Sequence, residues 1–263
     1  PYVSRLYFRD EFYLLLVLAT LGASVLVVTA HLVTFFIGLE ILGIALIGLI
    51  AYPANNVNES KSNKLTLSSN DDIALSSSSS YLEASLKFFV LSAAATAFVL
   101  MGIAFFYANT GSFIVNNALV SEALSPYYTA AAICLLFVGL GFKLSLVPFQ
   151  FWTPDVYDGA PMPVTAFIAS VSKGAVILFL LRFFTQVFAN PETAIPYGLV
   201  PVISLVAVTT ILAGNFMALL QVNIKRLLGY SSMAHMGYVM VLFVALLTQR
   251  ESDLGLAQES LIF

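Results

Sequence analysis

Apolar residues gather in long runs along this chain, and the stretches between the runs hold most of its charged residues. A helix that crosses the hydrocarbon core of a bilayer needs about 20 apolar residues. Seven runs come near this length, at residues 12–29, 32–52, 86–108, 127–152, 163–188, 196–221 and 227–247. The pattern therefore predicts an all-α fold, a polytopic transmembrane helix bundle. An eighth run begins at Leu261, so we interpret the chain as an internal piece of a larger polytopic protein.

Composition supports a membrane protein. Of the 263 residues, 60% are hydrophobic and 10% are charged, whereas a soluble domain has about 45–50% and about 25%. The net charge of -3 gives no polybasic surface, which argues against a nucleic-acid partner. The single cysteine, Cys134, excludes an internal disulfide framework and a thiolate metal cluster. The sequence holds no ligand pattern for haem, flavin or an iron–sulfur cluster.

One polar segment interrupts the apolar runs. Residues 55–80 are rich in serine and charge, and this low-complexity composition predicts a loop outside the bilayer. Lysines and arginines outside the runs set the orientation, because they are enriched in cytoplasmic loops. Most of them fall on one side, at Arg5, Arg9, Lys61, Lys64, Lys225 and Arg226. We expect this side to be cytoplasmic. The orientation of the protein in the membrane is a sufficient explanation for the presence of Lys225 and Arg226.

Three ionisable residues lie inside the apolar runs: Glu40, Lys143 and Lys173. A lysine at the centre of a bilayer costs about 2.5–3.5 kcal/mol on insertion scales, so such residues usually have a function. Lys143 lies about 24 Å along its helix from Tyr127, too deep to reach the headgroups easily. The run of Lys173 is antiparallel to that of Lys143, which brings both lysines to a similar depth.

The direction of helical side chains suggests how these charges interact. A side chain leans toward the N-terminus of its helix, which directs Lys143 toward the depth of Glu40. We therefore expect a Glu40–Lys143 ion pair. Burial disfavours the charged form of each residue and mutual attraction favours it, so the pair is a candidate proton switch. Lys173 is placed to exchange that proton, through ordered water.

Two further residues allow either a structural or a functional interpretation. Lys87 follows Glu83 by four residues, so an ion pair at the membrane interface accounts for it as well as a role in proton transfer does. His235 has Ser231, Ser232 and Tyr238 near it in sequence. It is as well suited to helix packing as to a proton relay.

Pro148 predicts a break in the helix that carries Lys143. Proline lacks an N–H and clashes with the carbonyl of Leu144 four residues before it. In a membrane such a break persists where neighbouring helices or water bind the freed groups, as in an ion path, although an ordinary proline kink is the alternative. We expect the glycines of residues 139–142 to allow close helix packing, and Asp155 and Asp158 to serve as turn and cap residues.

These residues lie in stretches that resemble a known family. The stretches are FFIGLEILGIALIGLIAY, YLEASLKFFVLSAAATAFVLMGIAFFYANTG, GLGFKLSLVPFQFWTPDVYDGAPMPVTAFIASVSKGA and NFMALLQVNIKRLLGYSSMAHMGY. They resemble the antiporter-like subunits of the proton-pumping NADH:quinone oxidoreductase, respiratory complex I, and subunit N above all. Two features depart from that pattern: Gln150 stands where many relatives have histidine, and the serine-rich insertion is long.

The resemblance implies a fourteen-helix antiporter-like protein with two inverted five-helix units, each containing one broken helix. Residues 1–188 would form the first unit and residues 189–263 the truncated start of the second. It also implies roles for the ionisable residues. Glu40 would be the acidic partner, Lys143 the lysine of the broken helix and Lys173 the central lysine, with Lys87 and His235 as lesser members of a hydrophilic axis.

The function that the resemblance implies is proton translocation, coupled to quinone reduction elsewhere in the complex. The chain itself would bind no cofactor or metal, while the whole complex would use NADH, FMN, iron–sulfur clusters and quinone. Its partners would be other membrane subunits of complex I, the lipid bilayer, protons and water. It would reside in a bacterial inner membrane or an organelle inner membrane. Two alternatives stay open: a subunit of a multisubunit cation/proton antiporter, and a structural membrane subunit that transports nothing.

Overall fold

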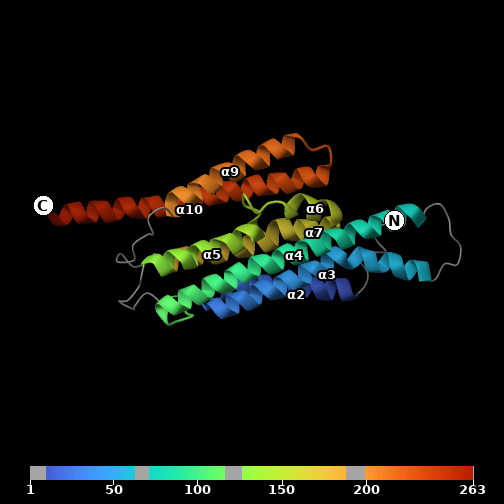
Figure 1. Cartoon of the computed structure of the whole chain (residues 1–263), viewed down its shortest axis with the longest axis horizontal. Helices are drawn as coiled ribbons and strands as arrows, with labels where there is room; N and C mark the ends of the chain where they lie inside the picture. Colours follow the sequence, from blue (N-terminus) through green and yellow to red (C-terminus); the bar gives the residue numbers. More distant parts are fainter. Residues whose placement is uncertain (1–9, 63–70, 116–125, 188–198, 263) are drawn as a thin grey trace.

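The computed structural model describes residues 10–62, 71–115, 126–187 and 199–262, and side chains within them except at 53–62, 71–80, 126, 187 and 249–262. These residues form an elongated bundle of helices that run roughly along one direction (Figure 1). The helices are α2 Asp10–Val28, α3 Leu32–Ser62, α4 Asp71–Thr110, α5 Pro126–Leu144, α6 Trp152–Gly159, α7 Met162–Phe167, the π-helix η2 Ile168–Ser172, α8 Lys173–Val187, α9 Leu199–Leu219 and α10 Ile224–Ile262.

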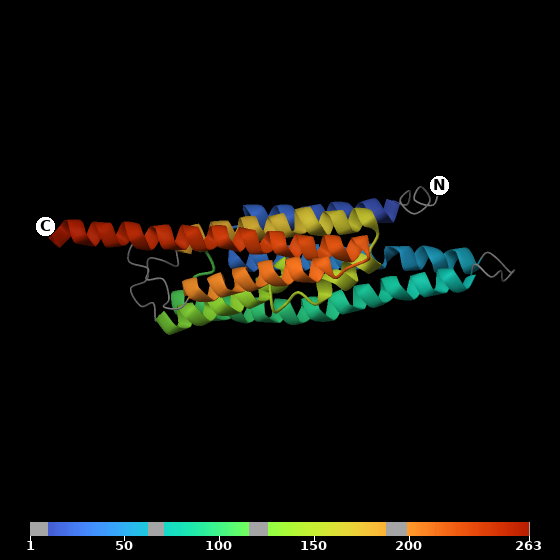
Figure 2. The same cartoon turned by 90° about the horizontal axis from the view of Figure 1, so that it is seen from above.

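Seven helical segments of the described chain are long and apolar enough to cross a membrane. They are Asp10–Val28, Leu32–Tyr52, Tyr81–Thr110, Tyr127–Leu144, Met162–Gln186, Leu199–Leu219 and Ile224–Thr248. Their extended, nearly parallel arrangement is visible in both views (Figures 1 and 2). The predicted all-α membrane bundle is therefore confirmed.

The prediction of a loop over residues 55–80 was wrong for most of that segment. Helix α3 continues through its polar end to Ser62, and α4 begins at Asp71, well before its apolar part. Once a helix has formed, each added residue costs little, and serine lowers helix stability only modestly relative to alanine. The polar residues can therefore extend both helices beyond the apolar spans. Residues 63–70 lie outside the described part of the chain.

Leu261 was also misinterpreted as the start of an eighth run. Helix α10 continues without interruption from Ile224 to Ile262, so Leu261 belongs to the end of the helix that carries the seventh apolar run. Apolar composition alone cannot tell a new run from a continuing helix when no helix-breaking residue separates them. The division into units at residue 188 falls in a segment outside the described residues and stays a prediction.

The helix predicted over residues 127–152 is broken, as Pro148 indicated. Helix α5 ends at Leu144, and the short helix α6 starts only at Trp152. The segment that follows is continuous from Met162 to Val187, but five of its residues form a π-helical turn directly before Lys173. Each of the two buried lysines thus lies beside one of these irregular points.

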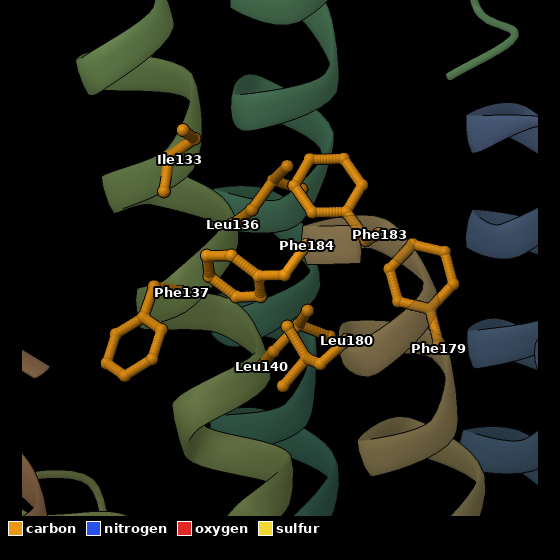
Figure 3. A pocket seen from close by; sticks show the side chains of 8 residues that line it. All are labelled: Ile133, Leu136, Phe137, Leu140, Phe179, Leu180, Phe183 and Phe184. Atoms are coloured by element: carbon orange, nitrogen blue, oxygen red, sulfur yellow. The ribbon is translucent and has the colours of Figure 1, made fainter. Parts of the chain in front are cut away.

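Close helix packing holds α4 against α5. A Cβ atom added at Gly139 would lie 2.6 Å from the carbonyl oxygen of Ala95 and would also meet the Val99 side chain. This approach confirms the packing role predicted for that glycine, because a small residue lets the two backbones come together. A pocket between α5 and α8 has only apolar walls (Figure 3). Its lining residues are Ile133, Leu136, Phe137, Leu140, Phe179, Leu180, Phe183 and Phe184.

Candidate functional site

The break after α5 is stabilised by hydrogen bonds that replace the missing helical ones. Ser145 takes a positive φ of 62°, and the N–H of Leu146 donates to the carbonyl oxygen of Gly141 at 2.9 Å. The indole N–H of Trp152 at the start of α6 donates to the carbonyl oxygen of Phe142 at 2.9 Å. A positive φ is uncommon for a residue other than glycine, so the chain is held in this turn by its surroundings.

A second helix also stabilises the break. The N–H of Val147 donates to the hydroxyl of Thr210 on α9 at 3.1 Å, and the Thr210 side chain is fully buried. This bond satisfies one backbone donor that the break leaves unpaired, as a membrane interior requires. Three buried oxygen atoms of the same segment have no hydrogen-bond partner in the described protein: Ser145 Oγ, Gln150 Oε1 and Thr153 Oγ1.

Lys143 lies one residue before the end of α5 and is buried. Its Nζ donates a hydrogen bond to the hydroxyl of Ser92 on α4 at 2.7 Å. The ring centroid of Phe88, one turn earlier on α4, lies 5.3 Å from the same atom. Helix α3 contributes Gly43 to this site, and a Cβ atom added at Gly43 would lie 3.4 Å from Lys143 Nζ.

Glu40 stands three residues before Gly43 on α3 and is partly buried. Its carboxylate acts electrostatically on the Lys143 ammonium. No ion pair within 4.0 Å joins the two residues in the described structure, and the hydrogen bond of Lys143 goes to Ser92 instead. The Glu40–Lys143 ion pair therefore stays a prediction.

Lys173 is the most deeply buried cation of the described residues, with 1% of its surface exposed. It follows the π turn, and its Nζ donates to the hydroxyl of Ser232 on α10 at 2.9 Å. The ring centroid of Tyr157 on α6 lies 5.8 Å from this Nζ, and the Tyr157 hydroxyl is 3.3 Å from Ser232 Oγ. Three helices therefore meet at one buried ammonium group.

Lys87 makes the ion pair that the sequence predicted and a second one that it did not. Its Nζ lies 2.7 Å from Glu83 Oε1 on its own helix and 2.9 Å from Asp155 Oδ2 on α6. The other carboxylate oxygen of Asp155 lies 3.4 Å from Arg226 Nη2 on α10. Lys87 is half-exposed, in contrast to the two buried lysines.

The turn role expected for the two aspartates was wrong, and Lys225 and Arg226 make contacts that the sequence did not predict. Asp155 and Asp158 lie on helix α6 rather than in a turn, and Arg226 Nε lies 3.0 Å from Asp158 Oδ2. Lys225 donates to the carbonyl oxygens of Asp158 and Ala160 at 3.1 Å, where α6 ends. These basic residues therefore bind the C-terminal end of α6, where cations are favoured, besides any effect on orientation.

His235 lies on an exposed face of α10, and its ring centroid is 6.3 Å from that of Tyr238. The structure brings Ser232 to Lys173 but leaves His235 apart from that cluster in the described residues. The sequence did not indicate the roles of Ser92, Tyr157 and Thr210, and it suggested Ser232 as a neighbour of His235 rather than as the partner of Lys173. Serines and threonines are common in membrane helices, so no sequence signal singles these out.

Comparison with known proteins assigns the family. Residues 73–255 match the family model described as NADH:quinone oxidoreductase/Mrp antiporter, transmembrane. The chain belongs to this family. It resembles a chain of respiratory complex I from Thermus thermophilus with bound aureothin, with 39% identity and a TM-score of 0.66. That match covers 88% of this chain and 44% of the other.

Two other complexes contain chains of the same fold. The archaeal membrane-bound sulfane sulfur reductase gives 25% identity and a TM-score of 0.70, covering 86% of this chain and 41% of that one. The Mrp complex from Dietzia sp. gives 22% identity and a TM-score of 0.70, covering 88% and 39%. This family member thus spans less than half the length of the chains it matches, and all three belong to membrane complexes.

Proposed function

We propose that this chain is an antiporter-like, proton-translocating subunit of an NADH:quinone oxidoreductase of the complex I type, and that it corresponds to subunit N. The observation that carries the proposal is the pair of buried lysines at irregular helix points. Each ammonium donates to a serine hydroxyl on a different helix, Lys143 to Ser92 and Lys173 to Ser232. Ionisable residues buried in a membrane protein are costly, and they mark proton and ion paths.

In this mechanism Lys143 and Glu40 form the switch. When quinone is reduced elsewhere in the complex, a change in local charge weakens the interaction of Glu40 with Lys143, and the lysine releases its proton toward Lys173. Buried oxygen atoms at the break, such as Ser145 Oγ, are the kind of group that ordered water satisfies. Water at this position would carry the proton between side chains. Lys87 and His235 would belong to the ends of the path.

The chain itself binds no NADH, flavin, iron–sulfur cluster or quinone in this proposal, since other subunits would hold them. The bacterial inner membrane is the proposed location. Identity supports complex I over the alternatives: 39% to the Thermus chain, against 25% and 22% to the sulfur reductase and Mrp chains. Sodium-dependent transport by a native complex that lacks a quinone reductase would instead favour a cation/proton antiporter, and identification of co-purifying subunits tests this.

The deciding experiment replaces Lys143 by alanine in the intact membrane complex. We expect quinone reductase turnover and proton translocation to fall together by at least about tenfold, the size of a lost proton-transfer group. Cys134→Ala is the matched control, because Cys134 lies on the same helix and is exposed. It should keep both activities. Full pumping by Lys143→Ala would contradict the proposal.

A purely structural role for the charges needs a separate control. If Glu40 and Lys143 only held the helices together, then replacing them by leucine and methionine in one protein would preserve pumping and could raise stability. The proton-transfer mechanism predicts instead that this double variant assembles and does not pump. Thermal unfolding of the purified complex and proton uptake by vesicles measure the two outcomes separately.

A further inference from the structure

The short helix α6 connects the surroundings of both buried lysines. At its start, the Trp152 indole donates to the carbonyl oxygen of Phe142, the residue before Lys143. Farther along, the Tyr157 ring faces Lys173 and its hydroxyl lies 3.3 Å from Ser232. Asp155 stands between these two residues on the same helix.

Asp155 uses its two carboxylate oxygens for two different helices. Oδ2 lies 2.9 Å from Lys87 Nζ on α4, and Oδ1 lies 3.4 Å from Arg226 Nη2 on α10. These are the same two helices that supply the hydrogen-bond acceptors of the buried lysines. Ser92 follows Lys87 by five residues and Ser232 follows Arg226 by six, about 7.5 Å and about 9 Å along the helix axes.

We infer that Asp155 is a positioning residue for proton transfer: it fixes α4 and α10 against α6 so that Ser92 and Ser232 stay in reach of the buried lysines. This inference rests on the proposed function. In the described part of the chain, the side chain of neighbouring Asp158 contacts only Arg226 on α10 and Asn223 just before α10, whose amide donates to Asp158 Oδ1 at 2.7 Å. Asp155 therefore joins both lysine environments, and Asp158 joins one.

A small displacement of the helices that Asp155 joins should have a large effect on proton transfer at the buried lysines. The ion pairs of Asp155 are partly exposed, so each contributes little to stability by itself. A proton passes only between groups held at hydrogen-bond distance, and misplacing reacting groups by about 1 Å can cost about a hundredfold in rate. Removing the Asp155 charge should therefore reduce turnover more than it reduces the amount of assembled complex.

The test is Asp155→Asn in the intact complex, with Glu83→Gln as the matched control. Both acids contact Lys87, but Glu83 lies on the same helix as Lys87 and, among the described residues, forms an ion pair with no second helix. We expect Asp155→Asn to lower turnover per assembled complex about fivefold, because two modest ion pairs are lost. Asp155→Glu keeps the negative charge and should restore part of the turnover. The pH profile of turnover should be displaced, since the lysines lose fixed hydrogen-bond partners. Glu83→Gln should stay within about twofold of the parent.

Two results would overturn the inference. One is an Asp155→Asn complex with unchanged turnover and pH profile. The other is a loss that follows only the quantity of assembled complex, which would make Asp155 a purely structural residue. If Asp155→Asn fails to assemble, Arg226→Gln removes the α10 contact of Asp155 together with the Arg226–Asp158 pair. Asp158→Asn weakens only the second pair and is its control for the same two readouts. Lys143→Ala is measured in parallel: if it pumps normally the proposed function fails, whereas an inactive Lys143→Ala beside a normal Asp155→Asn rejects only the positioning role.

Discussion

Lys143 and Lys173 are both buried and both donate to a serine, but their electrostatic surroundings differ. Lys143 has the carboxylate of Glu40 acting on it from α3. Lys173 has the Tyr157 ring and the Ser232 hydroxyl, and no carboxylate acts on it within the described part of the chain. A buried charge with an opposite charge nearby is less costly than one without. Under the proposed function, this difference predicts a gated proton at Lys143 and a transiently held proton at Lys173.

The largest effect should come from replacing Lys173 by arginine. Arginine keeps the positive charge but does not release its proton in proteins, so a transient carrier would be blocked. We expect proton translocation and turnover to fall by at least about tenfold, the scale of a lost acid–base group. Vesicles that contain the intact complex provide the measurement.

Arg182→Lys is the control for this exchange. It exchanges the same two residue types at a partly buried position on α8, where the arginine donates to the carbonyl oxygen of Val28. Its activity should stay near that of the parent complex. Normal pumping by Lys173→Arg would show that Lys173 need not release a proton, and the contrast with Lys143 would lose its meaning.

A smaller effect is expected from Glu40→Gln, which keeps the shape of the side chain and removes its charge. Lys143 would then resemble Lys173, with a hydroxyl partner and no carboxylate. We expect turnover to fall about fivefold, because the energy of a partly screened charge pair is near 1 kcal/mol. The ratio of protons moved to quinone reduced should be recorded together with the rate. An unaltered rate and ratio would mean that the carboxylate does not distinguish the two sites.

The two serines allow the finest test. Ser232→Ala should lower turnover about threefold, since Lys173 loses a hydrogen bond to a charged group and has no acid to compensate. Ser92→Ala removes the equivalent bond from Lys143, where the charge of Glu40 remains, and should stay within about twofold. Steady-state turnover of both complexes at equal assembly is the measurement. Equal losses, or a larger loss for Ser92→Ala, would argue against the proposed difference between the sites.

Much of this arrangement could be predicted from the sequence, because a helix that crosses a membrane requires a long apolar run. Long apolar runs predicted the spans, and Pro148 predicted the end of α5 near Leu144. The burial of Lys143 and Lys173 follows from their positions inside apolar runs. The Lys87–Glu83 pair needed only the four-residue spacing of a helix.

The contacts between helices were harder to predict, since no local pattern records them. Ser92 and Ser232 resemble any other serines until the structure places them beside a lysine. Asp155 was expected to serve a turn because its neighbours include proline and glycine, yet those residues lie at the ends of a short helix. The polar extension of α3 was missed for another reason. Hydropathy predicts which residues lie in the bilayer, and a helix can continue beyond them.

The π turn before Lys173 has a geometric consequence. One turn of an α-helix holds 3.6 residues, so each added residue rotates everything after it by about 100° around the axis. A π turn takes up one extra residue within its length. Were residues 168–172 to wind as an ordinary α-helix, the Lys173 ammonium would point to a different side of α8, away from Ser232. The widened turn thus sets the direction of this side chain around the helix axis. Deleting one residue within the turn would remove the extra residue, so an ordinary α-helix could then hold Lys173 in the same direction.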